Sequence, residues 1–154
     1  MLSDQERHEI EEEFKLYPYK SAASIEALKV VQKHRGWISD ESIKDIAEML
    51  EIAPDELDAV ATFYNLIYRK PVGRHVIHIC NSVSCWVMGY EGILKQLSES
   101  LGVKYGETSS DGRFTLLPVP CLGTCDHAPA LMIDGDLHRD LTPEKINAIL
   151  QSYQ

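Results

Sequence analysis

The sequence predicts a protein of the α/β class, in which a helical bundle precedes a domain of mixed strands and helices. Two observations carry this prediction. Up to about residue 68, apolar residues recur every three to four positions, and from residue 75 onward short apolar runs alternate with a period of two. Between the two patterns lies a segment rich in Pro, Gly and basic residues, 69–74. We therefore expect two domains, residues 1–72 and residues 73–154.

Composition narrows the class of protein. The chain has 154 residues, 44% of them hydrophobic, and a net charge of −9, which argues against a nucleic-acid surface. No run of about 18 apolar residues is present, so we expect no membrane insertion. The acidic start of the chain resembles neither a secretory signal nor a transit peptide. We therefore expect the cysteines to lie in a reducing compartment, where metal or catalytic use is commoner than lasting disulfides.

Capping residues and apolar spacing predict four helices in the first domain. The first is capped by Ser3 or Asp4, ends near Phe14 and is rich in Glu, so we expect it to be solvated. The second covers 24–35, because Gly36 is a typical residue just past a helix end.

The third helix starts after Ser39 or Asp40, and the fourth starts with Pro54 in its first turn. Their apolar residues lie at helical spacing: Ile43, Ile46, Ala47, Leu50, Leu57, Val60, Ala61 and Tyr64. We expect no cluster of titratable groups to point into this bundle, so its expected role is structural.

The second domain reads as alternating strands and helices. The expected elements are a strand over 75–80, one helix from Cys85 to residue 101, strands over 113–119 and 130–133, a returning strand at 137–138 and a last helix capped by Thr142. Asp134-Gly135 predicts the hairpin turn between the last two strands. This order is a thioredoxin-like layout.

All four cysteines of the chain lie in this domain as two close pairs. Four residues separate Cys80 from Cys85, and three separate Cys121 from Cys125. The first pair spans a strand end and a helix start, where free backbone N–H groups favour thiolate. The second pair encloses Gly123, which lets backbone N–H groups approach sulfur. Four thiols sorted two and two are typical of an iron–sulfur cluster or a structural zinc ion.

The spacing leaves three kinds of site open. A [2Fe–2S] cluster is favoured over zinc, because zinc ribbons usually place about two residues between paired cysteines. A thiol–disulfide oxidoreductase is less favoured, because neither pair is Cys-x-x-Cys. The plant-type ferredoxin spacing is also absent. A structural zinc site in an interaction module therefore remains the main alternative from another class of protein.

The segments around the cysteines carry a family resemblance. They are Cys80-Asn-Ser-Val-Ser-Cys85-Trp-Val-Met-Gly89 and Val119-Pro-Cys121-Leu-Gly-Thr-Cys125-Asp-His-Ala-Pro129. Both resemble the ligand motifs of the thioredoxin-like [2Fe–2S] ferredoxins, and more narrowly those of the E subunits of bacterial NADH:quinone oxidoreductase, respiratory complex I. Further matching segments lie at 35–38, 61–64, 111–114 and 141–144. The resemblance implies a C-terminal thioredoxin-like [2Fe–2S] ferredoxin domain after the helical bundle.

The resemblance also implies a function. Cys80, Cys85, Cys121 and Cys125 would bind one [2Fe–2S] cluster, with one pair on each iron. The cluster would exchange single electrons with the FMN of a partner flavoprotein subunit that also binds NADH. Other iron–sulfur subunits of the peripheral arm would be neighbours, on the cytoplasmic side of the inner membrane. Similar subunits occur in NAD-linked formate dehydrogenases and hydrogenases, which remain alternatives.

We expect no catalytic residue and no nucleotide site on this chain, because no glycine-rich phosphate loop follows a strand. His127 and His78 are interpreted as loop and packing residues, because four cysteines suffice as ligands. Trp86 and Met88 are expected either to cover the cluster or to pack in the core. Three aromatic residues before residue 69 are expected to fill a core or to face a partner: Phe63, Tyr64 and Tyr68.

Overall fold

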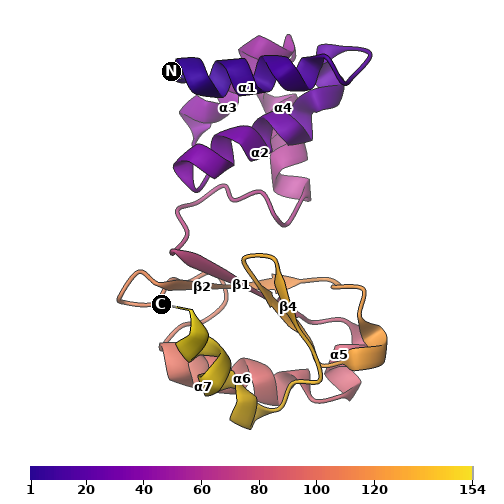
Figure 1. Cartoon of the computed structure of the whole chain (residues 1–154), viewed down its shortest axis with the longest axis vertical. Coiled ribbons are helices and arrows are strands. Elements are labelled where there is room, and N and C mark those ends of the chain that lie inside the picture. Colours follow the sequence, from indigo (N-terminus) through magenta and orange to yellow (C-terminus); the bar gives the residue numbers. More distant parts are fainter. Residues whose placement is uncertain (154) are drawn as a thin grey trace. The chain divides into compact units, whose positions relative to one another are not determined.

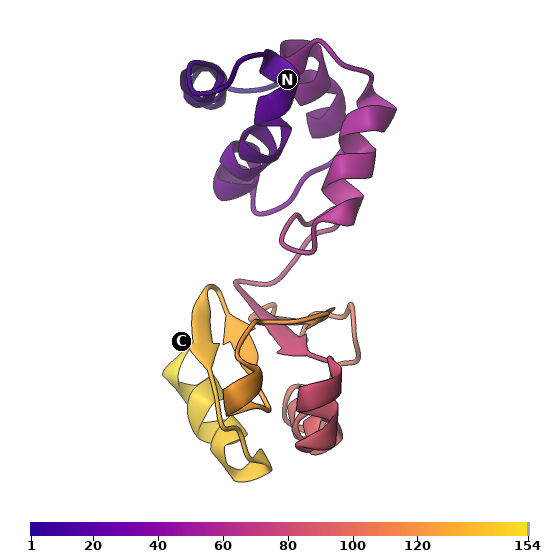
Figure 2. The same cartoon turned by 90° about the vertical axis from the view of Figure 1, so that its right-hand side faces the viewer.

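The computed structural model describes residues 1–153. The chain divides into two compact units, Met1–Pro71 and Val72–Gln154. Figures 1 and 2 show helices throughout the first unit and a sheet with helices in the second. In the described part of the chain, no helix combines the length and the apolar character needed to span a membrane. The predicted α/β class is confirmed.

The first unit contains the four predicted helices. They are α1 (Asp4–Phe14), α2 (Ser24–Arg35), α3 (Asp40–Leu50) and α4 (Pro54–Phe63), with a short 3-10 turn, η1 (Lys20–Ala23), before α2. The apolar stripes predicted on α3 and α4 face inward, since Ile46, Leu50 and Leu57 are fully buried. Phe63 and Tyr64 are 76% and 43% exposed, so neither fills a core as one expectation held.

The ends of these helices follow from local chemistry. Ser3 Oγ accepts a hydrogen bond from the Glu6 backbone N–H, and the Glu6 carboxylate accepts one from the Ser3 N–H, which forms a capping box. Ser39 caps α3 by accepting from the Ser42 N–H at 3.2 Å. Gly36 ends α2 with a φ of 81°, a left-handed conformation that glycine adopts without a steric penalty.

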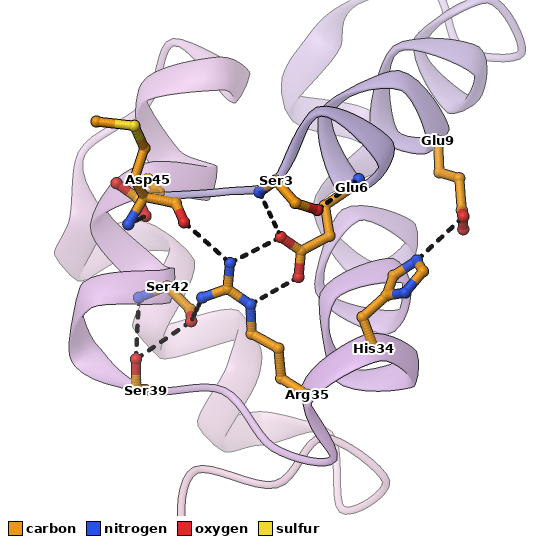
Figure 3. A network of polar contacts seen from close by, with 9 residues as sticks. Ser3, Glu6, Glu9, His34, Arg35, Ser39, Ser42 and Asp45 are labelled. Carbon is orange, nitrogen blue, oxygen red and sulfur yellow. Dashed lines mark hydrogen bonds and ion pairs between the residues drawn. The ribbon is translucent and has the colours of Figure 1, made fainter.

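A buried ion pair ties α1 to α2 (Figure 3). The guanidinium of Arg35 donates to both carboxylate oxygens of Glu6, at 2.6 and 2.7 Å, and also to Ser42 Oγ and the Met1 carbonyl. Glu6 is 2% exposed, yet its hydrogen bonds with Arg35 outweigh burial and lower the pKa of this carboxyl to about 2.

This ion pair corrects one expectation. Helix α1 is not simply solvated, because it buries Glu6 and Ile10. Glu6 is a single buried carboxylate, and its partner in this unit is Arg35.

The second unit is built on a four-stranded sheet (Figure 1). Its strands are β1 (His75–Cys80), β2 (Phe114–Val119), β3 (Leu131–Ile133) and β4 (Asp136–His138), in the order β2-β1-β3-β4. Strands β1 and β2 are parallel, and the other two pairings are antiparallel. The predicted strands, the hairpin and the return strand are confirmed.

Helices α6 (Tyr90–Leu101) and α7 (Pro143–Ser152) pack on one face of this sheet (Figure 2). The alternation of side chains along β1 explains which face is covered, because Ile77 and Ile79 enter this core and His78 between them points to the opposite side. The remaining members of the core come from the other strands, the helices and their connections: Ile93, Leu97, Val103, Phe114, Leu116, Leu131, Ile133, Leu141, Ile146 and Leu150.

One helix was expected after β1, and the structure contains two. Helix α5 (Val83–Val87) stops, and α6 starts at Tyr90 after Gly89, whose φ is 103°. A left-handed residue cannot continue a right-handed helix, so Gly89 turns the chain and gives α6 its own direction. The expectation of one helix is therefore wrong at this point.

Candidate metal centre

Parallel pairing brings the two cysteine segments to one edge of the sheet. Cys80 is the last residue of β1 and lies opposite Val119, the last residue of β2. The Asn81 N–H donates to the Val119 carbonyl at 3.1 Å, which continues the pairing past the strand ends. Because the carboxyl ends of parallel strands meet, Cys121 leaves the sheet two residues beyond the position opposite Cys80.

The first pair of cysteines is buried. Cys80 and Cys85 are 3% and 2% exposed, and they pack together with Val119 and Ala128. Burial, and next the hydrogen bond with the Cys80 thiol, raise the pKa of Cys85 to about 11. Burial of Cys85 therefore opposes the thiolate form that a helix N-terminus favours. A bound metal reverses this balance, since a coordinating thiol is deprotonated outright.

The second pair of cysteines is exposed. Cys121 and Cys125 lie in the segment after β2, and Cys125 begins a short 3-10 turn, η2 (Cys125–His127). The Gly123 N–H donates to Cys121 Sγ at 3.2 Å, which Gly123 reaches with a φ of 73°. The predicted approach of a backbone N–H group to sulfur is confirmed. Such a bond stabilises negative charge on a thiolate.

The structure brings part of the cysteine set together. Cys80 hydrogen-bonds with Cys85, and Cys125 lies close enough to influence the charge of Cys85. Cys125 also lines an open hollow with four residues of the α5 region, Val83, Ser84, Val87 and Met88. Within residues 1–153, no three side chains of His, Cys, Asp or Glu gather into a group that could hold one metal ion. Cysteine thiolates are soft ligands that suit an iron–sulfur cluster as well as zinc.

The other residues singled out in the sequence lie at the surface or within the sheet. His127 Nδ1 lies 2.9 Å from Asp140 Oδ2, which holds the loop after Cys125. His78 is 2% exposed within the sheet. Trp86 and Met88 are 58% and 61% exposed, so core packing is wrong for both of them.

Sequence reasoning missed Tyr90 and Tyr105. The ring of Tyr90 packs against the group formed by Cys80, Cys85, Val119 and Ala128. Its hydroxyl hydrogen-bonds with that of Tyr105. In the sequence, Tyr90 is not distinguished from other residues of the expected helix. Gly89 before it is the one signal that could have pointed to a helix break at this position.

Comparison with known proteins defines the class of the chain. The family of thioredoxin-like [2Fe-2S] ferredoxins matches residues 10–154. The chain belongs to this family, as its cysteine motifs predicted.

Its relatives are more specific. The E subunit of the NADH-quinone oxidoreductase of Pseudomonas aeruginosa is 50% identical over 153 residues, covering 99% of this chain and 92% of the relative. The E subunit of the same enzyme from Escherichia coli (strain K12) is 53% identical, with the same coverage. Among solved structures, an air-oxidized NAD+-reducing [NiFe]-hydrogenase superposes with a TM-score of 0.72 at 23% identity. That match covers 86% of this chain and 23% of the hydrogenase chain, and it supports the fold.

Proposed function

We propose that this chain is the E subunit of an NADH:quinone oxidoreductase and carries electrons through one [2Fe–2S] cluster. The observation that carries the proposal is the cysteine arrangement at the carboxyl ends of β1 and β2, in a chain half identical to subunits of that name. Cys80 and Cys85 hold one iron, and Cys121 and Cys125 hold the other. When bound, such a cluster accepts and releases one electron at a time.

The residues of the chain shape the site in two ways. The buried pair and its apolar neighbours keep water from one side of the sulfurs, which acts on the reduction potential. The Gly123 N–H supplies a hydrogen bond to sulfur on the exposed side. NADH and FMN bind the partner flavoprotein subunit, and the electron passes between its flavin and this chain. The complex places this subunit in its peripheral arm, on the cytoplasmic side of the membrane.

Metal and sulfide analysis tests this function. Anaerobically purified chain is expected to contain about two irons and two acid-labile sulfides, and to give an EPR signal near a g-value of about 2 after dithionite reduction. A purified chain that contains one zinc ion and no sulfide would overturn the proposal and favour a structural zinc site. The relatives at half identity favour the quinone oxidoreductase over formate dehydrogenases or hydrogenases.

The flavoprotein docks on the exposed side of α5. This helix region presents apolar side chains to solvent: Val83 at 69%, Trp86 at 58%, Val87 at 68% and Met88 at 61% exposure. Three of these residues line the hollow that contains Cys125. A partner that exchanges electrons with the cluster has to approach the exposed cysteines, and covering these side chains removes apolar surface from water at the same time.

Val87→Asp tests the docking surface. We expect the dissociation constant for the flavoprotein subunit to rise at least about tenfold, because a charge at the centre of an apolar interface has to be desolvated. Leu16→Asp is the matched control, since Leu16 is similarly exposed, at 74%, but belongs to the helical unit. Isothermal titration calorimetry measures both, and EPR checks that the cluster is intact. Unchanged affinity of Val87→Asp would refute this surface.

A further inference from the structure

The structure points to a tyrosine as part of the cysteine site. Tyr90 is the first residue of α6 and follows Gly89, the residue that separates α5 from α6. Its ring is partly buried and packs both on the group of Cys80 and Cys85 and on the main core of the sheet. A helix continuing straight from α5 would carry this ring elsewhere. The break at Gly89 therefore has a spatial result, which is an aromatic ring against the buried thiols.

A second tyrosine holds the hydroxyl end of that ring. Tyr90 Oη and Tyr105 Oη are hydrogen-bonded, and Tyr105 lies between α6 and β2. Burial and the Tyr90 hydroxyl raise the pKa of Tyr105 well above its ordinary value.

The segment that carries Tyr105 is itself tied to the sheet. The Gly106 N–H donates to the Leu116 carbonyl at 2.8 Å, and the Leu116 N–H donates to the Glu107 carbonyl at 3.2 Å. Leu116 belongs to β2, the strand that leads to the second cysteine pair. Tyr105 is thus fixed on the sheet, and through it the position of Tyr90 is fixed as well.

We propose that Tyr90 is a positioning residue of the cluster site: its ring closes the buried side of Cys80 and Cys85 against water, and its hydrogen bond to Tyr105 holds the ring in place. This inference rests on the proposed function, because it assigns Tyr90 a role toward the cluster those cysteines hold. The apolar shell around a metal site controls both solvent access and reduction potential. Water close to the sulfurs favours the more negatively charged, reduced form.

Tyr90→Leu tests the ring. We expect iron release to a chelator to become about tenfold faster, in line with the loss seen when groups that support metal ligands are removed. The reduction potential, followed by EPR in a redox titration, should become less negative. Tyr90→Phe keeps the ring, so its rate of iron release should lie within about threefold of the wild-type rate.

The matched control is Tyr153→Leu, because Tyr153 packs on the main core of the same unit but not on the group of Cys80 and Cys85. It should leave the potential and the rate of iron release unchanged. Equal effects of Tyr90→Leu and Tyr153→Leu, or no effect of Tyr90→Leu, would overturn the inference.

The hydrogen bond has a test that keeps the core filled. Tyr90→Phe and Tyr105→Phe should each raise the release rate slightly, and the double variant should do no more than either alone, because both remove one bond. Fully additive effects would contradict the pairing. A wild-type chain that binds no iron would refute both the proposed function and this inference. A cluster whose potential and iron-release rate stay the same in Tyr90→Leu would refute this inference alone.

Discussion

Cys121→Ala is expected to abolish the [2Fe–2S] cluster and to loosen the second unit while the helical unit stays folded. Cys121 is exposed, so its removal leaves no cavity in the core, and any loss of order has to come from the lost ligand. Metal binding and folding are coupled where ligands come from separate segments, and the proposed ligands come from the end of β1 and from the segments that follow β1 and β2. The first unit has its own core and should not respond.

Iron and sulfide content measures the first part of this prediction, and hydrogen exchange resolved by segment measures the second. We expect an almost complete loss of iron. We also expect faster hydrogen exchange in β2 and in the loop that follows it. Ser82→Ala is the control, because Ser82 precedes α5 in the same region and its side chain forms no capping bond. Cys121→Ala with a full cluster signal would show that the ligand assignment is wrong.

Glu6→Gln is expected to cost the helical unit about 3 kcal/mol of unfolding free energy at pH 7. The figure follows from the pKa of Glu6, which falls from 4.5 to about 2 on folding, at about 1.4 kcal/mol for each unit of pKa. Because the folded-state pKa is the lower one, the stabilisation is complete above about pH 5 and is lost as the pH falls toward 2. The wild-type unit should therefore weaken over that acid range, and the variant should weaken much less.

Urea unfolding at a series of pH values, followed by hydrogen exchange in α1 and α2, measures this difference. Glu12→Gln is the matched control on the same helix: Glu12 pairs with Lys15, and both side chains are at least half exposed. Water screens such surface pairs, so they contribute little to the free energy of unfolding. If Glu6→Gln and Glu12→Gln changed the free energy of unfolding equally, the ion pair of Glu6 with Arg35 would not stabilise the bundle more than a surface pair does.

Much of the fold could be predicted because its signals are local. Ser39 and Gly36 mark helix ends by their own hydrogen bonding and backbone freedom, and Asp134-Gly135 marks a hairpin. The two cysteine pairs can be recognised from their spacing, whereas their meeting at one edge of the sheet follows from the parallel pairing of β1 and β2. Spacing within each pair needs no knowledge of distant residues.

The features that escaped prediction depend on distant partners. Glu6 and Arg35 are 29 residues apart, and a glutamate among other glutamates reads as a solvated residue until its partner is placed. The break at Gly89 is not forced by the sequence, because glycine is tolerated within helices. Only the packing of Tyr90 against the thiols shows why the chain turns there.

The parallel pairing of β1 with β2 also determines where inserted residues would disturb the second unit. The two cysteine segments are set by the strands that carry them, with Cys80 opposite Val119. The connection from α6 to β2 carries Tyr105, so residues inserted before Tyr105 would displace its hydroxyl from that of Tyr90 while the pairing of β1 with β2 stayed the same. One residue inserted within β2 would shift its register and turn every side chain beyond it to the other face of the sheet. Differences in length among related chains should therefore be absent from the six residues of β2.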